Sequence, residues 1–126
     1  MSIFKSIPLY IRLYKNKTKI SRLDTGETIE RISPNPFSNK RIVFGNFLVA
    51  EEFLKSVIKE LVPKKSFFTT LSVLLHQLEL VEEGLTEIEK RAIKDSAIHI
   101  GASECILYEE QSELTHQEAL NLTKSK

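Results

Sequence analysis

The sequence predicts an α/β fold in which helices flank a mixed five-stranded sheet, in the order β-β-β-α-β-α-β-α. Three observations carry this prediction. Alternating apolar residues separated by turn signals indicate an antiparallel meander over residues 7–32. A run of apolar and β-branched residues over 68–80 indicates a central strand that is buried on both faces. The remaining segments carry helix caps and apolar residues at helical spacing.

The meander consists of three short strands, which we place at residues 7–14, 18–23 and 28–32. In the first strand every second residue is apolar, the period of two that turns one face toward a core: Ile7, Leu9, Ile11 and Leu13. Residues 15–17 form a tight turn, and Gly26 permits a positive φ in the second turn. Pro34 and Pro36 end the meander, because proline cannot donate to a strand ladder.

The first helix is predicted to run from its cap, Asn46, to about Leu61, and Pro63 stops it. Its core-facing residues recur at helical spacing: Phe47, Ala50, Leu54, Ile58 and Leu61. Glu51 and Lys55 lie four residues apart, and we expect both on the solvent-exposed side of this helix.

The second helix begins at a capping box, in which the side chains of Thr86 and Glu89 each accept from the backbone amide of the other. It ends at Gly101. We expect its inner face to consist of Ile88, Ala92, Ser96 and Ile100. A fifth strand follows over residues 104–108, and Thr115 then caps a last helix that carries Ala119, Leu120 and Leu122.

This order of elements is that of the ribonuclease-H-like plan, which the actin superfamily shares. Two segments, 47–60 and 84–110, resemble the first subdomain of the bacterial actin MreB, the rod shape-determining family. In that family a Glu-Arg-Arg-Ala-Ile helix precedes a strand that closes on two glutamates, and here Glu89-Lys-Arg-Ala-Ile93 and Glu109-Glu110 hold those places. Residues 38–52 resemble the central segment of small bacterial proteins of the YjaA type, which are associated with stress response.

The resemblance to actins ends where those proteins bind phosphate. Their first strand leads into an Asp-Leu-Gly-Thr-like loop, whereas this chain has Arg12 in place of the Asp and Tyr14 in place of the Gly. A bulky side chain prevents the close backbone approach to phosphate that glycine permits. The nucleotide pocket of actins also needs a second domain, which 126 residues do not accommodate. We therefore expect no cofactor and no ATPase activity.

Composition indicates one globular domain over residues 1–126, with residues 1–6 and 123–126 expected to fray. Apolar residues make up 41% of the chain and charged residues 28%, which excludes the disordered and fibrous classes. No apolar run reaches the roughly 18 to 20 residues of a membrane span, and the start lacks the apolar centre of a signal peptide, so we expect no membrane insertion and a cytoplasmic location. The single cysteine, Cys105, fits a reducing compartment and is expected to be an inert core thiol.

Residue sets that would support catalysis or metal binding are absent from the sequence. Ribonuclease-H-type nucleases hold metal ions with carboxylates from the first strand, and residues 7–14 contain no Asp or Glu. The three histidines, His76, His99 and His116, lack the short spacing of zinc ligands. We expect a core hydrogen bond for His76 and surface positions for the other two. We predict no catalytic, cofactor-binding or metal-binding residues, and no enzymatic activity.

Charge is distributed unevenly along the chain. Residues 1–65 contain 13 Lys and Arg against 6 Asp and Glu, a net charge of +7, whereas residues 66–126 contain 5 against 11, a net charge of −6. This split favours a partner with a charged patch, although intermixed charges on a solvated surface explain it too. The meander supplies the candidate partner surface, which consists of Arg12, Lys15, Lys17, Lys19 and Arg22.

These observations predict a non-enzymatic protein-interaction module, linked to stress response or to cell-shape machinery. Its partner would be an unknown protein, a second copy of the chain included. The alternative is nucleic-acid binding by the basic meander, with Tyr10 and Tyr14 as stacking platforms. The net charge of only +1 disfavours it, and lysines on an exposed hairpin also protect edge strands from pairing. A third class, a small hydrolase, would require a pocket in which several ionisable groups converge.

Overall fold

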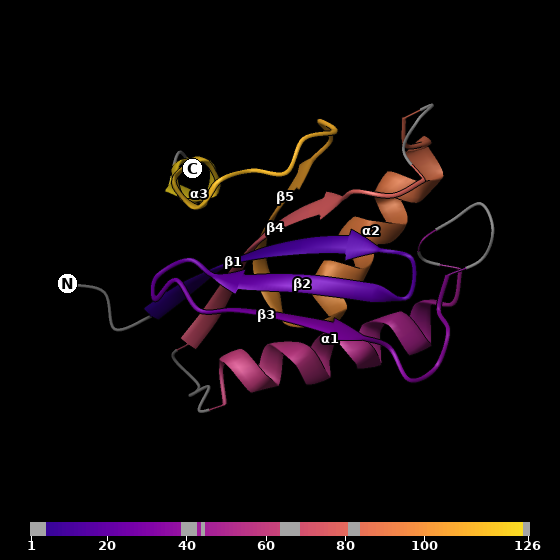
Figure 1. Ribbon diagram of the computed structural model, residues 1–126, viewed down its shortest axis with the longest axis horizontal. Helices are drawn as coiled ribbons and strands as arrows, with labels where there is room; N and C mark the ends of the chain where they lie inside the picture. The colour runs from indigo at the N-terminus through magenta and orange to yellow at the C-terminus, as the bar shows by residue number, and fades with distance from the viewer. Residues whose placement is uncertain (1–4, 39–42, 44, 64–68, 81–83, 125–126) are drawn as a thin grey trace.

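Five strands form one mixed sheet, and three helices pack against its two faces (Figure 1). The computed structural model describes residues 5–38, 43, 45–63, 69–80 and 84–124. Along the chain the elements are β1 (Lys5–Tyr14), β2 (Lys17–Arg22), β3 (Thr28–Ile32), α1 (Phe47–Leu61), β4 (Thr69–Gln77), α2 (Glu87–His99), β5 (Ala102–Tyr108) and α3 (His116–Lys124). The prediction of an α/β fold with a mixed five-stranded sheet and flanking helices is confirmed.

The strands lie in the order β3-β2-β1-β4-β5. Strand β2 is antiparallel to both of its neighbours, whereas β4 is parallel to β1 and to β5. All residues of β4 from Leu71 to Gln77 are buried, which confirms the prediction of a strand covered on both faces. This strand ends at Gln77, three residues earlier than predicted, and Leu80 beyond it has a φ of 59°, outside the extended region. Phe68, where the predicted strand begins, lies outside the described residues.

The two ends of the described chain are more ordered than the sequence indicates. Lys5 and Ser6 pair with Thr69 and Thr70 of β4, so the prediction that residues 1–6 fray is wrong for these two residues. Helix α3 continues to Lys124, which extends it into the segment that we expected to fray. Residues 1–4 and 125–126 lie outside the described part of the chain.

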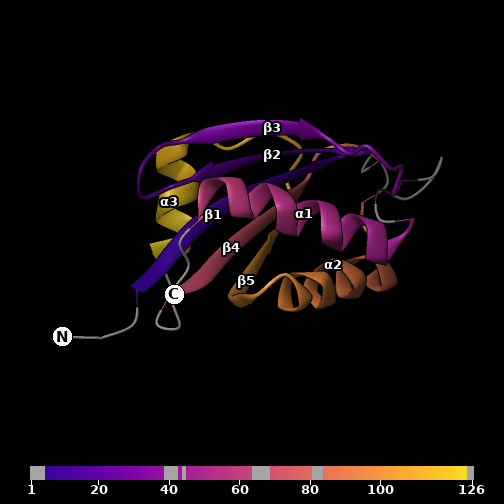
Figure 2. The same ribbon diagram turned by 90° about the horizontal axis from the view of Figure 1, so that it is seen from below.

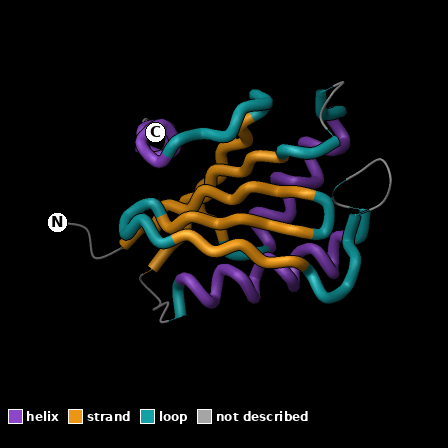
Figure 3. Tube along the Cα trace, in the orientation of Figure 1, coloured by secondary structure: helices purple, strands orange, loops and turns teal. Residues whose placement is uncertain are grey.

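Two apolar cores lie on opposite faces of the sheet. The larger core, between the sheet and helices α1 and α2, takes every second residue of β1 from Ile7 to Leu13. The smaller core lies beneath α3 and includes Tyr10 of β1, Leu74 of β4 and Ala119 of α3. Figure 2 shows α1 and α2 next to one another, and Figure 1 and the tube in Figure 3 show α3 apart from them.

The helix caps predicted from the sequence are present. The Asn46 side chain accepts a hydrogen bond from the amide of Val49. At α2, Thr86 Oγ1 accepts from the Glu89 amide and Glu89 Oε1 accepts from the Thr86 amide, both at 3.1 Å. Gly101 follows this helix with a φ of 100°, the left-handed conformation that ends many helices.

Two residues that we expected on inner helix faces point to solvent instead. Ile88 of α2 is 82% exposed and Phe47 of α1 is 45% exposed. The predicted inner face of α2 used a spacing of four residues, which drifts by about 40° around the helix at each step. Over the three steps from Ile88 to Ile100 the drift reaches about 120°. The buried positions of α2 are Ile93, Ser96 and Ala97, and Ile100 directly after the helix is buried too, so the prediction is confirmed for Ser96 and Ile100.

Candidate functional site

One titratable side chain from each strand lies in a single row across the sheet, on the face that carries α3. Strand registers place Arg12 opposite Lys19 and His76, Lys19 opposite Glu30, and His76 opposite Tyr108. Side chains that are direct cross-strand neighbours point to the same face of a sheet. We call this set the polar row; from β3 to β5 it consists of Glu30, Lys19, Arg12, His76 and Tyr108.

Arg12, at the centre of the polar row, is only 4% exposed. Its Nε donates to the carbonyl oxygen of Lys19 at 3.2 Å, and its Nη2 donates to Ser21 Oγ. The guanidinium carbon lies 4.3 Å from the centroid of the Tyr10 ring. A fourth contact, from Nη1 to Glu113 Oε2 at 3.1 Å, joins the guanidinium to a carboxylate. Three neutral groups and one carboxylate, that of Glu113, therefore contact the Arg12 guanidinium.

His76 is fully buried beside Arg12 and is held by two hydrogen bonds. Its Nε2 lies 2.5 Å from the carbonyl oxygen of Glu110, which can only accept, so this nitrogen carries the proton. Nδ1 then accepts from the Tyr10 hydroxyl at 2.6 Å. Burial lowers the pKa of His76, although the bond to Glu110 acts in the opposite direction, and burial raises the pKa of Tyr10. The predicted core hydrogen bond of His76 is confirmed.

The segment between β5 and α3, residues 109–115, is anchored at three points, two on the polar row and one on the neighbouring Tyr10. The Glu110 carbonyl accepts from His76, Glu113 pairs with Arg12, and the Leu114 amide donates to the Tyr10 hydroxyl at 3.0 Å. Glu113 Oε2 also lies 3.4 Å from Lys19 Nζ. Partial burial of Glu113 acts to raise its pKa, but the charges of Arg12 and Lys19 hold that pKa below its ordinary value.

A hollow of about 440 Å³ opens beside this anchored segment. Its lining brings together ionisable and hydroxyl groups from both halves of the chain, among them Tyr10, Arg12, Lys19, Thr28, Glu113 and His116. Sequence reasoning missed this site, because Glu113 and His116 lie about a hundred residues from Arg12. The available signal was the alternation of β1, which places Tyr10 and Arg12 on the face opposite the larger core.

The predicted partner surface is only partly a surface. Arg12 is buried, and Arg22 is largely covered because it binds the Asp24 carboxylate at 2.8 Å and the Leu61 carbonyl at 3.0 Å. The expectation that Arg12 is exposed to a partner is therefore wrong, and Arg22 keeps only part of its side chain exposed. Lys19 and Lys17 are half-buried; Lys19 pairs with Glu113, and the Lys17 ammonium lies over the ring of Tyr14, 4.6 Å from its centroid. Lys15 is exposed.

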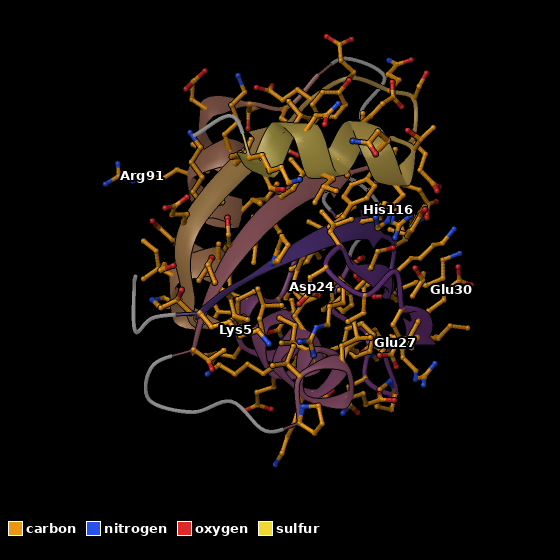
Figure 4. The ribbon with its side chains drawn as sticks, turned by 90° about the vertical axis from the view of Figure 1, so that its left-hand side faces the viewer. Lys5, Asp24, Glu27, Glu30, Arg91 and His116 are labelled. Atoms are coloured by element: carbon orange, nitrogen blue, oxygen red, sulfur yellow. The ribbon has the colours of Figure 1, made fainter. Side chains whose placement is uncertain are left out.

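A second candidate surface is a stripe on the outer side of α2. Four exposed residues recur there at spacings of three and four, which aligns them on one side of the helix: Ile88, Arg91, Asp95 and Ile98. Ile98 is 67% exposed, so both apolar members face solvent. Within the described part of the chain, Arg91 and Asp95 have no ion-pair partner. Figure 4 shows Arg91 projecting away from the body of the protein.

Comparison with known proteins shows two similarities. The chain is 27% identical over 92 residues to the uncharacterized protein YjaA of Escherichia coli K12, in an alignment that covers 69% of this chain and 71% of YjaA. Its fold is similar to that of MreB5 of Spiroplasma citri, solved bound to ADP, with a TM-score of 0.57 and 16% identity. No family model matches the chain. Both resemblances that the sequence predicts are thus confirmed, and the second one shows an actin-like fold.

The match to MreB5 covers 82% of this chain and 38% of that protein, so this chain spans well under half of its length. Among the described residues, no three His, Cys, Asp or Glu side chains lie close enough to hold a metal ion. No helix in the described ranges is long and apolar enough to cross a membrane. Cys105 is half-buried rather than fully buried, because β5 is an edge strand, and it packs against the larger core.

Proposed function

We propose that this protein is a non-enzymatic protein-interaction module whose partner is a second copy of the same chain. The exposed stripe on α2 carries the proposal, because it is complementary to itself. When two such stripes meet antiparallel about a two-fold axis, Ile88 faces Ile98 of the second copy and Arg91 faces Asp95 of the second copy. Both pairs are centred on the same helix position, so one axis satisfies them together.

The expected strength of this contact is modest. Burial of one isoleucine side chain contributes about 1.5 to 3 kcal/mol, and the pairing covers Ile88 and Ile98 of each copy. Exposed ion pairs such as Arg91 with Asp95 of the second copy add at most about 1 kcal/mol each. Association costs about 4 to 15 kcal/mol, which offsets most of this gain, so we expect a weak dimer with a dissociation constant in the millimolar range.

The non-enzymatic part of the proposal rests on the phosphate-binding end of β1. The side chains of Arg12 and Tyr14 stand where actins have an acid and a glycine, and both are occupied by contacts within the chain. We also propose that the fold is the ribonuclease-H-like, actin-type subdomain, which the strand order β3-β2-β1-β4-β5 supports. The proposed cytoplasmic location is supported by the lack of an apolar run of membrane-span length and by the single cysteine. The proposed setting in stress response or cell-shape machinery rests on the sequence resemblances alone.

The basic meander gives less support to nucleic-acid binding. Binding of a phosphate backbone requires accessible cations, and Arg12, Lys19 and Arg22 already contact carboxylates of the chain. The affinity of the protein for a fluorescent single-stranded oligonucleotide, measured first at low salt and then at higher salt, tests this alternative. Submicromolar, steeply salt-dependent binding would favour this alternative over self-association.

Sedimentation equilibrium over a wide concentration range tests the proposed dimer. Arg91→Asp places like charges across the two-fold axis and should weaken self-association, and addition of Asp95→Arg should restore it. Lys94→Asp is the matched control, because Lys94 is exposed on the same helix, lies outside the stripe and carries the same charge change. A monomer at all concentrations, or a double variant as weak as the single variant, would overturn the proposal.

A further inference from the structure

The Arg12 guanidinium is held in place by groups other than its carboxylate partner. The Lys19 carbonyl, the Ser21 hydroxyl and the Tyr10 ring fix its plane and its position. Arginine has five N–H donors, and the contacts with described residues use three of them. Without Glu113, the floor of the hollow would still present an oriented cation with spare donors.

A contribution to stability does not by itself explain why a buried position on a sheet face holds an arginine. Desolvation of an ion pair offsets much of its attraction, and apolar residues of similar volume often serve stability equally well. The opposite face of β1 has such apolar residues: Ile11 and Leu13, which flank Arg12 in the sequence, are fully buried in the larger core. The presence of a charged side chain at this buried position therefore points to recognition of an anion.

Glu113 shows which anion fits. A single oxygen, Oε2, contacts both Arg12 and Lys19, so the carboxylate binds through one of its two oxygens. The Glu113 side chain is 42% exposed and belongs to a connecting segment rather than to a helix or strand. A carboxylate that engaged the guanidinium through both oxygens would bind it more strongly and could replace Glu113.

We infer that the hollow is a receptor for a carboxylate side chain of an acidic peptide segment, and that Glu113 occupies this receptor from within the chain until such a segment displaces it. A volume of about 440 Å³ accommodates a side chain and the adjoining backbone. Thr28 and His116 at the rim offer hydrogen-bonding groups to that backbone. The site lies on the sheet face opposite α1 and α2, so it is independent of the proposed dimer.

A titration with a blocked tetraglutamate peptide, followed through the NMR signal of Arg12 Nε–H, tests the inference. Glu113→Gln removes the competing charge and should tighten peptide binding about tenfold. Lys19→Gln should weaken it by a similar factor, whereas Lys17→Gln, a matched lysine on the same strand, should leave it unchanged. Melting curves of each variant verify that the fold is retained.

Two results would overturn the inference. The first is binding by Glu113→Gln that is no tighter than that of the unmodified protein, because displacement of Glu113 would then have no part in recognition. The second is succinate binding as tight as that of the peptide, because a free dicarboxylate would then be the ligand and the peptide assignment would be wrong.

Discussion

Glu51 of α1 contacts His99 of α2, with Oε2 of the glutamate 2.9 Å from Nδ1 of the histidine. The Glu51 side chain is mostly buried, whereas that of His99 is mostly exposed. This contact ties the two helices together. It also corrects the expectation that Glu51 lies on the solvent-exposed side of α1.

Loss of this interhelix contact should be measurable. Glu51→Ala is expected to lower the free energy of unfolding by about 0.5 to 1 kcal/mol at neutral pH, since the pair is partly screened by solvent. A double-mutant cycle with His99→Ala isolates the pairwise part in urea denaturation. Additive effects of the two changes would show that the contact contributes nothing to stability.

The capping box of α2 should contribute a comparable amount. Thr86→Ala removes the acceptor for the Glu89 amide and should cost about 1 kcal/mol. For a domain of this size, the melting temperature should fall by about 3 to 5 °C. Thr86→Ser keeps the hydroxyl and is the control. An equal melting temperature for the Ala variant and the unmodified protein would place the start of the helix elsewhere.

Stability should depend on the titration of His76. Its pKa is lowered in the folded protein from an ordinary value of 6.5, so the unfolded chain takes up this proton first. The free energy of unfolding should therefore be full above about pH 6.5 and decrease below it, with a slope of at most about 1.4 kcal/mol per pH unit. Urea denaturation at several pH values measures the slope. The slope between about pH 6.5 and pH 5 should shrink in His76→Gln, and an unchanged slope would assign it to other groups.

Arg12 and Lys15 should respond very differently to loss of charge. Arg12→Met removes three hydrogen bonds of the guanidinium and should lower the free energy of unfolding by about 1 to 2 kcal/mol. The loss is limited because Glu113 keeps its contact with Lys19 and the Ser21 hydroxyl keeps its contact with Thr28. Lys15→Met changes an exposed side chain and should stay within about 0.5 kcal/mol of the unmodified protein. Similar values for both variants would contradict the burial of Arg12.

We expect the protein not to bind Mg-ATP. Tyr14 stands where the phosphate loop of actins needs a glycine, and its ring is covered by the Lys17 ammonium. Titration calorimetry with Mg-ATP should show no heat of binding. A dissociation constant in the micromolar range would require a nucleotide site that differs from that of actins.

Local signals in the sequence predict the secondary structure well. The capping boxes, Gly101 and the proline stops act over a few residues, so neighbours along the chain identify them. Strand β4 is recognisable because burial on both faces leaves an uninterrupted apolar run. These features depend on no knowledge of how distant segments meet.

The candidate sites depend on contacts that the sequence does not display. The row that joins Arg12 to His76 requires the register between strands that are 64 residues apart, and the position of Glu113 requires the path of a connecting segment. The outer stripe of α2 was hidden for a different reason. The spacing of four residues used for the prediction placed Ile88 on the inner face of the helix. The structure shows that Ile93 and Ala97 are buried there and that Ile88 is exposed.

The alternation along β1 has a consequence for folding as well as for binding. A slip of this strand by one residue against β4 would turn the Arg12 guanidinium toward the apolar layer beneath α1, and Ile11 toward the polar row. Both exchanges are unfavourable. The first buries a charge without a partner, and the second places an apolar side chain among hydrogen-bonding groups. Because one face of β1 is apolar and the other is polar, the observed register between β1 and β4 has a lower free energy than a register shifted by one residue.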